Sequence, residues 1–298
     1  MVKHAYLIMA HNQFEILEIL VKMLDDERND LYIHIDSKVK KFDFTYFQNV
    51  PKYSKISFIE RNSVTWGDFS LVKCEFLLLK SAVCNSKHIK YDYYHFLSGI
   101  DLPIKTNDEI FEFFNKNYGK EFLHFSANEP QPEFENRIRY YHFFRKKRNV
   151  VFKIFAQITL KIQKYFGVNR LKNKNIIVQK GSNWVSITND FAEYVVSRED
   201  FVKETFHHCY CGDEIFMQTL FINSPFKNNL YMPNCNDNQL ASARLIDWTR
   251  GNPYVFKSSD FNEIVSSPAM FARKFSADDK EIIYKIRDYV KSKQIERG

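Results

Sequence analysis

The residues with the clearest potential for chemistry form a short tetrad, Cys211-Gly212-Asp213-Glu214. Asp213 is a residue type that caps helices, and the apolar pattern after it predicts a helix through Leu220. Glu214 then lies in the first turn, where a carboxylate facing a cleft can take a proton from a hydroxyl group. The simpler alternative is that Glu214 only complements the positive end of the helix, worth about 0.3–1 kcal/mol. The tetrad alone favours this second alternative.

A second set of residues combines cations with an aromatic ring, in segments 244–251 and 271–275. Arginine forks and lysine point charges bind diphosphate oxygens and stabilise the negative charge that grows when a diphosphate departs. Trp248 offers a flat apolar face on which a sugar ring can stack. Taken alone, such residues are more often surface cations and a core tryptophan.

The elements that must position these groups alternate between strand and helix periods. Short apolar runs predict strands at 5–10, 31–35, 56–59, 94–97 and 121–125, and helical spacing predicts helices at 16–24 and 69–82. Thr106 and Glu109 form a capping box that begins a further helix. This alternation is typical of a parallel sheet covered by helices, which binds ligands at the carboxyl ends of its strands. His11, Asp36 and residues 98–101 follow strand ends, so we expect a nucleotide crevice in the N-terminal half.

Residues 137–174 have a basic and helical character. The cluster Arg145-Lys146-Lys147-Arg148 precedes an apolar stripe at helical spacing, with lysines opposite to it. The stripe consists of Val151, Ile154, Phe155, Ile158, Ile162 and Tyr165, and the opposite side of Lys153, Gln157, Lys161 and Lys164. The favoured interpretation is an ordinary surface helix with a solvated basic face. The alternative is that residues 145–166 lie on an anionic membrane.

Composition limits the class of protein. The chain has 298 residues, 45% of them hydrophobic and 27% charged, which allows one domain with a sizeable core and argues against disorder. No apolar stretch approaches the roughly 20 residues of a membrane span, and the first apolar run is too short for a signal peptide. Together with an odd number of cysteines, five, this predicts free thiols and a cytoplasmic location. The net charge of +7 suits an anionic partner.

Eight motifs follow one another along nearly the whole chain. They are AYLIMAH (5–11), YIHIDSK (32–38), VTWG (64–67), HFLSGIDLPIKT (95–106), KGSNW (180–184), CGDE (211–214), RLIDW (244–248) and FARKF (271–275). In these motifs and their order the chain resembles the core-2/I-branching β-1,6-N-acetylglucosaminyltransferases and the peptide O-xylosyltransferases of glycosyltransferase family 14. We expect a bacterial-type member of the family, without the luminal signal-anchor and the paired cysteines of the animal enzymes.

The resemblance implies a GT-A-like (Rossmann-like) mixed sheet with helices on both faces, and an inverting transfer of a sugar from a nucleotide-sugar without a metal. In this resemblance Glu214 matches the catalytic base. Arg250 and Lys274 match two cations that bind the diphosphate, with Arg244 as the alternative to Arg250. Metal-using transferases of this fold class hold the ion with an Asp-x-Asp pair, and the sequence contains no such pair. No metal and no other cofactor is therefore expected.

The resemblance also implies where the donor and the acceptor bind. Asp36 falls where the family contacts the nucleotide base, with His11 beside it. Trp248 matches an acceptor-binding tryptophan, and Glu129 and Arg137 lie in the region that shapes the acceptor site. The expected donor is a UDP-sugar, with GlcNAc favoured and xylose or another sugar as the alternative. The expected acceptor is a glycan or a lipid-linked oligosaccharide in the synthesis of a bacterial surface polysaccharide.

The expected organisation is one transferase domain with a helical insertion. It comprises a nucleotide-binding half (1–125), the basic helical insertion (137–174) and an acceptor and catalytic half (175–298). A non-catalytic carbohydrate-binding protein is the main rival, but it would need neither Glu214 nor the diphosphate cations. A zinc site at His207-His208-Cys209-x-Cys211 lacks a second ligand pair nearby. A nucleic-acid surface over residues 136–174 lacks a recognised fold signature, so no nucleic-acid partner is expected.

Overall fold

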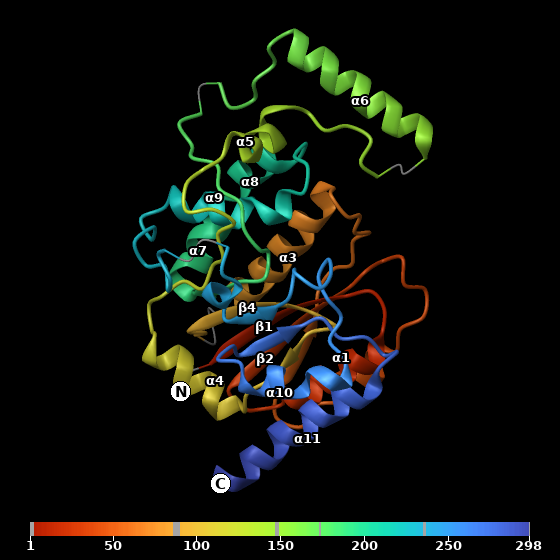
Figure 1. Cartoon of the computed structure of the whole chain (residues 1–298), viewed down its shortest axis with the longest axis vertical. Helices are drawn as coiled ribbons and strands as arrows, with labels where there is room; N and C mark the ends of the chain where they lie inside the picture. The colour runs from red at the N-terminus through yellow and green to blue at the C-terminus, as the bar shows by residue number, and fades with distance from the viewer. Residues whose placement is uncertain (1–2, 86–89, 147–148, 173, 235–236, 298) are drawn as a thin grey trace.

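The chain, seen here as a computed structural model, folds into helices around two β-sheets (Figure 1). The structure describes residues 3–85, 90–146, 149–172, 174–234 and 237–297. Cys235 and two members of the basic cluster, Lys147 and Arg148, lie outside these ranges. The other four cysteines are free thiols. None of the described helices has both the length and the apolar character needed to cross a membrane.

The larger sheet has five strands in the order β3-β2-β1-β4-β6. They are β1 (His4–Ala10), β2 (Asn29–Ile35), β3 (Lys55–Phe58), β4 (Tyr93–Ser98) and β6 (Ser186–Thr188). The first four are parallel, and β6 runs antiparallel to β4. Parallel strands in the order 3-2-1-4, joined through helices, form a Rossmann-like sheet. The expected GT-A-like mixed sheet is confirmed.

The strand expected at residues 121–125 is wrong. Within the described part of the chain this segment makes only isolated bridges, from Glu121 to Leu230 and from Phe122 to Ser186. The place beside β4 is already taken by β6, so the segment cannot extend the sheet there. Its apolar pattern reflects burial, because Phe122 packs in the core without a continuous strand partner.

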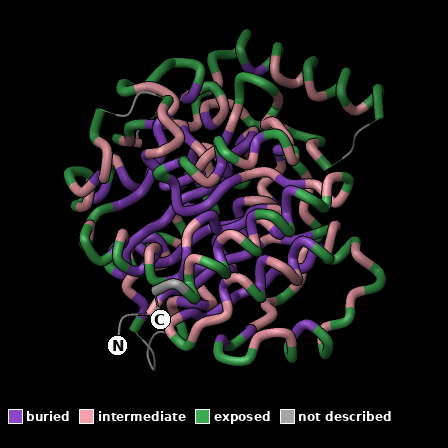
Figure 2. The backbone as a smooth tube through the Cα atoms, turned by 60° about the horizontal axis from the view of Figure 1, so that its bottom comes forward, coloured by how far each residue is buried: buried purple, intermediate pink, exposed green. Residues whose placement is uncertain are grey.

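Helices cover both faces of the larger sheet because successive side chains of a strand point to opposite faces. Ala5 and Leu7 of β1 pack on one face with α3 (Phe69–Asn85), α7 (Asn189–Ser197) and α9 (Phe216–Ile222). Tyr6 and Ile8 pack on the other with α1 (Phe14–Met23), α4 (Asn107–Lys116), α10 (Phe261–Ser266) and α11 (Lys280–Arg297). The buried segments of the chain form the centre of the molecule in Figure 2.

A small second sheet attaches the C-terminal part to the end of β4. It has the order β5-β8-β7, with β5 (Leu102–Pro103), β7 (Arg244–Ile246) and β8 (Phe271–Arg273). Arg244 is buried, and its Nη2 donates to the carbonyl oxygens of Phe96 at 3.0 Å and Val185 at 2.9 Å. This arginine therefore connects the two sheets and holds β8 beside the carboxyl end of β4.

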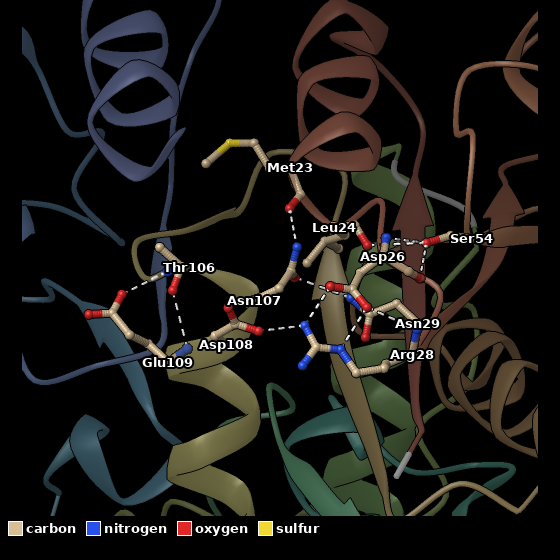
Figure 3. A network of polar contacts seen from close by, with 10 residues as sticks. All are labelled: Met23, Leu24, Asp26, Arg28, Asn29, Ser54, Thr106, Asn107, Asp108 and Glu109. Atoms are coloured by element: carbon tan, nitrogen blue, oxygen red, sulfur yellow. Dashed lines mark hydrogen bonds and ion pairs between the residues drawn. The ribbon is translucent and has the colours of Figure 1, made fainter. Parts of the chain in front are cut away.

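The capping box expected at the start of α4 is confirmed (Figure 3). The amide of Glu109 donates to Thr106 Oγ1 at 3.2 Å, and the amide of Thr106 donates to Glu109 Oε2 at 2.9 Å. Arg28 connects this helix to the loop before β2, since it donates to Asp26 Oδ2 at 2.6 Å and Asp108 Oδ1 at 2.7 Å. These contacts fix α4 against the amino ends of the strands, away from their carboxyl ends.

The tetrad 211–214 differs from its expected form. Gly212–Glu214 is a short 3₁₀ turn, preceded by Cys211 with φ of 48°, and α9 begins only at Phe216. Asp213 therefore does not cap a helix, because the chain makes a left-handed turn at Cys211, the first residue of the tetrad, and the N-cap of α9 is Ile215. The remaining elements are α2 (Phe44–Gln48), α5 (Pro132–Arg139), α6 (Val150–Tyr165), α8 (Glu199–Phe206) and the 3₁₀ turns at Gln239–Ser242 and Ser258–Asp260.

The helix expected in the basic insertion is confirmed as α6, which projects at one end of the molecule in Figure 1. Its expected orientation is wrong. The apolar stripe faces solvent, and the side buried against the chain is centred on Gln163. The sequence pattern defines the stripe, but only the surrounding structure determines which side of the helix packs.

Candidate active site

A cavity of about 910 Å³ opens at the carboxyl ends of β1, β2 and β4, where the sequence predicted a crevice. Loops after these strands form one wall, and the second half of the chain forms the other. Its main polar and aromatic lining residues are His11, Asn12, Asp36, Trp66, Ser98, His124, Lys180, Asn183, Trp184, Asp213, Glu214, Asp237, Trp248 and Arg273. A cavity of this size holds a small-molecule ligand, and its polar groups come from segments far apart in sequence.

Asp36 and His11, both predicted on the nucleotide side, lie in this cavity. Asp36 is buried directly after β2, where its Oδ1 accepts from the Lys38 amide at 2.8 Å and its Oδ2 from the Val64 amide at 3.3 Å. The Lys38 ammonium lies 3.4 Å from Oδ2. Asp36 is thus held by the backbone of two loops, while His11 lies exposed at the rim.

Glu214 enters the cavity from the opposite wall. Arg137 Nη1, from the last turn of α5, donates to Glu214 Oε2 at 2.7 Å, and Lys180 Nζ lies 3.9 Å from the same oxygen. The backbone is fixed as well, because the amide of Gly181 donates to the carbonyl of Glu214 at 2.9 Å. Among the described residues, the hydrogen bonds of this carboxylate involve Oε2 alone. Oε1 is therefore available to a bound hydroxyl group.

Two further carboxyl groups, which the sequence analysis did not select, lie near Glu214. Asp213 is buried, and burial together with the Glu214 charge raises the pKa of Asp213 to about 7. Glu75 of α3 is also buried, and its Oε1 accepts from Asn183 Nδ2 at 2.9 Å. Burial and the neighbouring Asp213 charge raise the pKa of Glu75 well above its usual range. Burial therefore favours the neutral form of the Asp213 and Glu75 carboxyl groups, which lie near Glu214.

Replacing Glu75 with Gln should stabilise the protein at alkaline pH. The folded state binds the Glu75 proton more tightly than the unfolded state, so the wild-type free energy of unfolding falls as pH rises above the ordinary pKa of 4.5. Glutamine is neutral and keeps an oxygen for Asn183. We expect Glu75→Gln to raise the thermal midpoint by about 2 °C or more at pH 8, and by less at pH 5. Thermal unfolding between pH 5 and 8 measures this, and an equal change at both pH values would contradict it.

His124, Asp237 and Gln239 form a polar group that sequence reasoning missed. His124 Nδ1 accepts from the Ser182 amide at 3.1 Å, so Nε2 carries the proton and donates to Asp237 Oδ1 at 3.1 Å. Gln239 Nε2 lies 2.9 Å from the same ring nitrogen. Burial lowers the pKa of His124, which fits a neutral ring. Its position at the end of an apolar run was a usable signal, whereas Asp237 is 113 residues away in sequence.

Of the cations in segments 244–251 and 271–275, Arg273 lines the cavity, and Lys274 is its neighbour in sequence. Arg273 lines it, donates to Asp101 Oδ1 at 3.2 Å and lies 4.0 Å above the ring of Trp184. Lys274 is the next residue and is outside the lining. Within the described ranges no carboxylate forms an ion pair with Lys274. Arg273, which sequence reasoning passed over within its own motif, therefore lines the cavity together with Lys38 and Lys180.

The structure does not bring Arg250 or Arg244 into the cavity. Arg250 Nη1 lies 2.9 Å from Asp260 Oδ1, its Nη2 lies 2.8 Å from Glu263 Oε2, and its Nε pairs with Asp247. Three carboxylates thus occupy the guanidinium on the loop that follows Trp248. Arg244 is buried between the two sheets, and burial lowers its pKa.

The residues predicted for the acceptor are divided between the cavity and its surroundings. Trp248 lines the cavity and is 51% exposed, so its ring face is accessible. Trp66, which lies in one of the eight motifs but was given no role, also lines the cavity and is 62% exposed. Arg137 contacts Glu214 rather than the cavity directly, and Glu129 lies exposed outside the lining.

A mixed α/β sheet with a polar cavity at the carboxyl ends of its strands is the frame of an α/β enzyme that binds its ligand at that edge. The comparison with protein families makes this class specific. A family model described as Core-2/I-Branching enzyme matches residues 4–266. The chain therefore belongs to this family of glycosyltransferases.

Curated relatives agree with the family assignment. Xylosyltransferase 2 of Rattus norvegicus is 26% identical over 305 residues, which cover 97% of this chain and 34% of the relative. Xylosyltransferase 1 of Rattus norvegicus is 25% identical, with 97% of this chain and 35% of the relative covered. Xylosyltransferase sqv-6 of Caenorhabditis elegans is 26% identical, with 83% of this chain and 31% of the relative covered. The chain spans about a third of the length of these relatives.

Two solved glycosyltransferase structures are more distant matches. Mouse xyloside xylosyltransferase 1 in its apo form has 12% identity and a TM-score of 0.37, and the match covers 91% of this chain and 97% of the other. The apo form of GlyE from Streptococcus pneumoniae TIGR4 has 10% identity and a TM-score of 0.40, and the match covers 99% of this chain and 64% of GlyE. The family assignment depends on neither.

Proposed function

We propose that the chain transfers a sugar from a UDP-sugar to a hydroxyl group of a glycan or lipid-linked oligosaccharide, with inversion and without a metal. The observation that carries this proposal is the placement of Glu214. Its carboxylate lies in the same cavity as Asp36 and Trp248, and Arg137 holds one of its oxygens at 2.7 Å. A base with one oxygen held and the other open suits the deprotonation of a bound hydroxyl.

In the proposed reaction Glu214 Oε1 takes the proton of the acceptor hydroxyl while the hydroxyl oxygen attacks the anomeric carbon of the sugar. The bond from that carbon to the UDP oxygen breaks on the opposite face, so the configuration inverts. The electron pair of the broken bond stays on the β-phosphate. Fixed cations stabilise that charge without a metal, and the absence of an Asp-x-Asp pair from the sequence supports this assignment.

We assign the diphosphate to Lys274, which follows the cavity-lining Arg273. Arg250 is the second candidate and would have to leave its three carboxylates to reach a ligand. The buried Asp36, with His11 at the rim, would bind the uridine part of the donor. Trp248 would stack on the acceptor sugar, and Arg137 would act on the acceptor side through its contact with Glu214. Glu129 would take part only if its loop moved toward the cavity.

The donor sugar that we propose is GlcNAc, following the resemblance to the β-1,6-N-acetylglucosaminyltransferases. The curated relatives are named xylosyltransferases, and this favours UDP-xylose as the second candidate. A cytoplasmic enzyme of surface polysaccharide synthesis is the proposed setting. A non-catalytic carbohydrate-binding protein would keep Trp248 but would gain nothing from an ion-paired carboxylate in the cavity.

A thermal-shift panel of nucleotides tests this proposal. A ligand that binds only the folded state adds about 2.7 kcal/mol of stability at 100 times its Kd, so we expect UDP and UDP-sugars to raise the midpoint by several degrees. The panel comprises UDP, GDP, CDP, UDP-GlcNAc, UDP-Glc, UDP-Gal and UDP-xylose, each with EDTA and with manganese. A UDP shift that persists in EDTA is the expected result, and the ranking of sugars identifies the donor. A shift only with manganese would contradict the metal-free mechanism, and none with any nucleotide would favour the carbohydrate-binding alternative.

A further inference from the structure

Helix α6 presents an apolar surface to solvent. The six residues of its stripe occupy positions i, i+3, i+4, i+7, i+11 and i+14, which lie on one side of an α-helix. They are Val151, Ile154, Phe155, Ile158, Ile162 and Tyr165, and each is between 46% and 86% exposed. Phe143 and Phe144, in the segment that leads into the helix, are also exposed. A continuous apolar strip of this kind on a soluble surface indicates an interaction site.

The rest of the helix explains why this strip cannot turn inward. Gln163 is buried, where its Oε1 accepts from the Tyr141 amide at 2.7 Å and its Nε2 donates to the Tyr141 carbonyl at 2.9 Å. Phe152 lies on the same side, with its ring 5.5 Å from that of Phe144. These contacts fix the side of α6 that faces the chain, so the apolar strip is held outward.

The charge of this segment is entirely of one sign. Residues 140–172 contain nine Lys and Arg residues and no Asp or Glu, whereas the whole chain has a net charge of only +7. The remainder of the chain is therefore net negative, by two charges. Three of these cations, Lys153, Lys161 and Lys164, lie on the polar flank of α6, between the apolar strip and the side buried at Gln163, and all three are exposed. An apolar strip bordered by lysines is the pattern of a helix that lies in the interface of an anionic bilayer.

We propose that α6 binds the surface of an anionic membrane, with the apolar strip below the headgroups and the three lysines beside the phosphates. A second copy of the chain fits this surface less well. In a symmetric dimer the same patch meets itself, so two purely cationic segments would face each other. An anionic lipid surface complements both the apolar and the charged part.

The segment also connects the membrane surface to the cavity. The backbone amide of Tyr210 donates to the carbonyl of Arg137 at 3.1 Å, and Arg145 stacks on the ring of Tyr210 at 3.9 Å. Arg137 in turn holds Glu214. If the proposed transferase function is correct, membrane docking through α6 places the base side of the cavity near the bilayer, where a lipid-linked acceptor would be presented.

Sedimentation of the full chain with vesicles tests the docking proposal. The vesicles contain phosphatidylcholine alone or with about 30% phosphatidylglycerol, and we expect at least about tenfold stronger binding to the anionic ones. The triple variant Ile154→Ser, Phe155→Ser, Ile158→Ser should lose about tenfold in binding, because it removes the centre of the strip. The variant Lys153→Gln, Lys161→Gln, Lys164→Gln should lose a similar factor and most of the salt dependence. Tyr284→Ser, on the exposed side of α11, is the matched control and should bind like wild type.

The outcomes separate docking from catalysis. Absence of binding to anionic vesicles, or binding by both α6 variants that equals that of wild type, would overturn the docking proposal. A dimer that both α6 variants abolish would assign the surface to a second copy instead. The UDP thermal shift of the α6 variants should equal that of wild type, because the strip lies outside the cavity lining. Vesicle binding without any nucleotide shift would leave docking supported and the proposed transferase function unsupported.

Discussion

Glu214→Gln is expected to lower kcat by about 10³-fold or more, while the affinity for UDP stays within about twofold. The substitution removes a carboxylate whose Oε1 is open to the cavity, while Arg137 and the Gly181 amide can still hold the side chain and the backbone. Glutamine has nearly the same volume, so the cavity should keep its shape. Initial rates with the best donor of the nucleotide panel, measured alongside UDP binding by calorimetry, test the expectation.

A matched variant separates loss of the base from loss of a charge. Glu112→Gln removes a carboxylate from the exposed side of α4, at the opposite end of the strands, and should leave both rate and affinity unchanged. Turnover of Glu214→Gln near the wild-type rate would exclude Glu214 as the base. In that case Asp213 would be the next candidate, because it lines the same cavity and its pKa is raised to about 7.

The elements that could be predicted from the sequence are those with a local cause. Strands β1, β2 and β4 each contain a mainly apolar run, and the start of α4 depends on two side chains three residues apart. The segment at 121–125 has the same apolar pattern as a strand, yet its place beside β4 is taken by β6, which comes about 60 residues later. The outward orientation of α6 depends on Gln163 and Tyr141, whose contact no periodicity reveals.

The residues of the candidate site likewise fall into those that the sequence could place and those whose position depends on distant parts of the chain. His11 and Asp36 could be placed because residues that follow parallel strands meet at one edge of a sheet. The environment of Arg250 could not, because it depends on Asp260 and Glu263 approaching from ten and thirteen residues away. The pairing of Arg137 with Glu214 spans 77 residues and likewise required the structure. Motif order selected some side chains that line the cavity, such as Glu214 and Trp248, whereas their partners follow from the fold.

Lys274→Ala is expected to weaken UDP binding by about tenfold or more, the effect of losing one hydrogen bond to a charged group. Lys274 follows Arg273, which lines the cavity, and no carboxylate among the described residues forms an ion pair with its ammonium. Its charge is therefore available to a diphosphate. The rate of transfer should fall further than binding alone explains, because negative charge on the β-phosphate grows as the sugar departs. Calorimetry with UDP and single-turnover rates measure the two effects separately.

Two other variants decide how this result is interpreted. Lys291→Ala removes an exposed lysine of α11 and should bind UDP like wild type, which controls for net charge. Arg250→Ala should mainly lower the thermal midpoint, because it leaves three carboxylates without their shared cation. If Lys274→Ala instead binds UDP normally and Arg250→Ala does not, the diphosphate cation is Arg250. The loop that follows Trp248 would then have to release Arg250 from Asp260 and Glu263 whenever a donor binds, and donor binding would be coupled to a rearrangement beside the acceptor site.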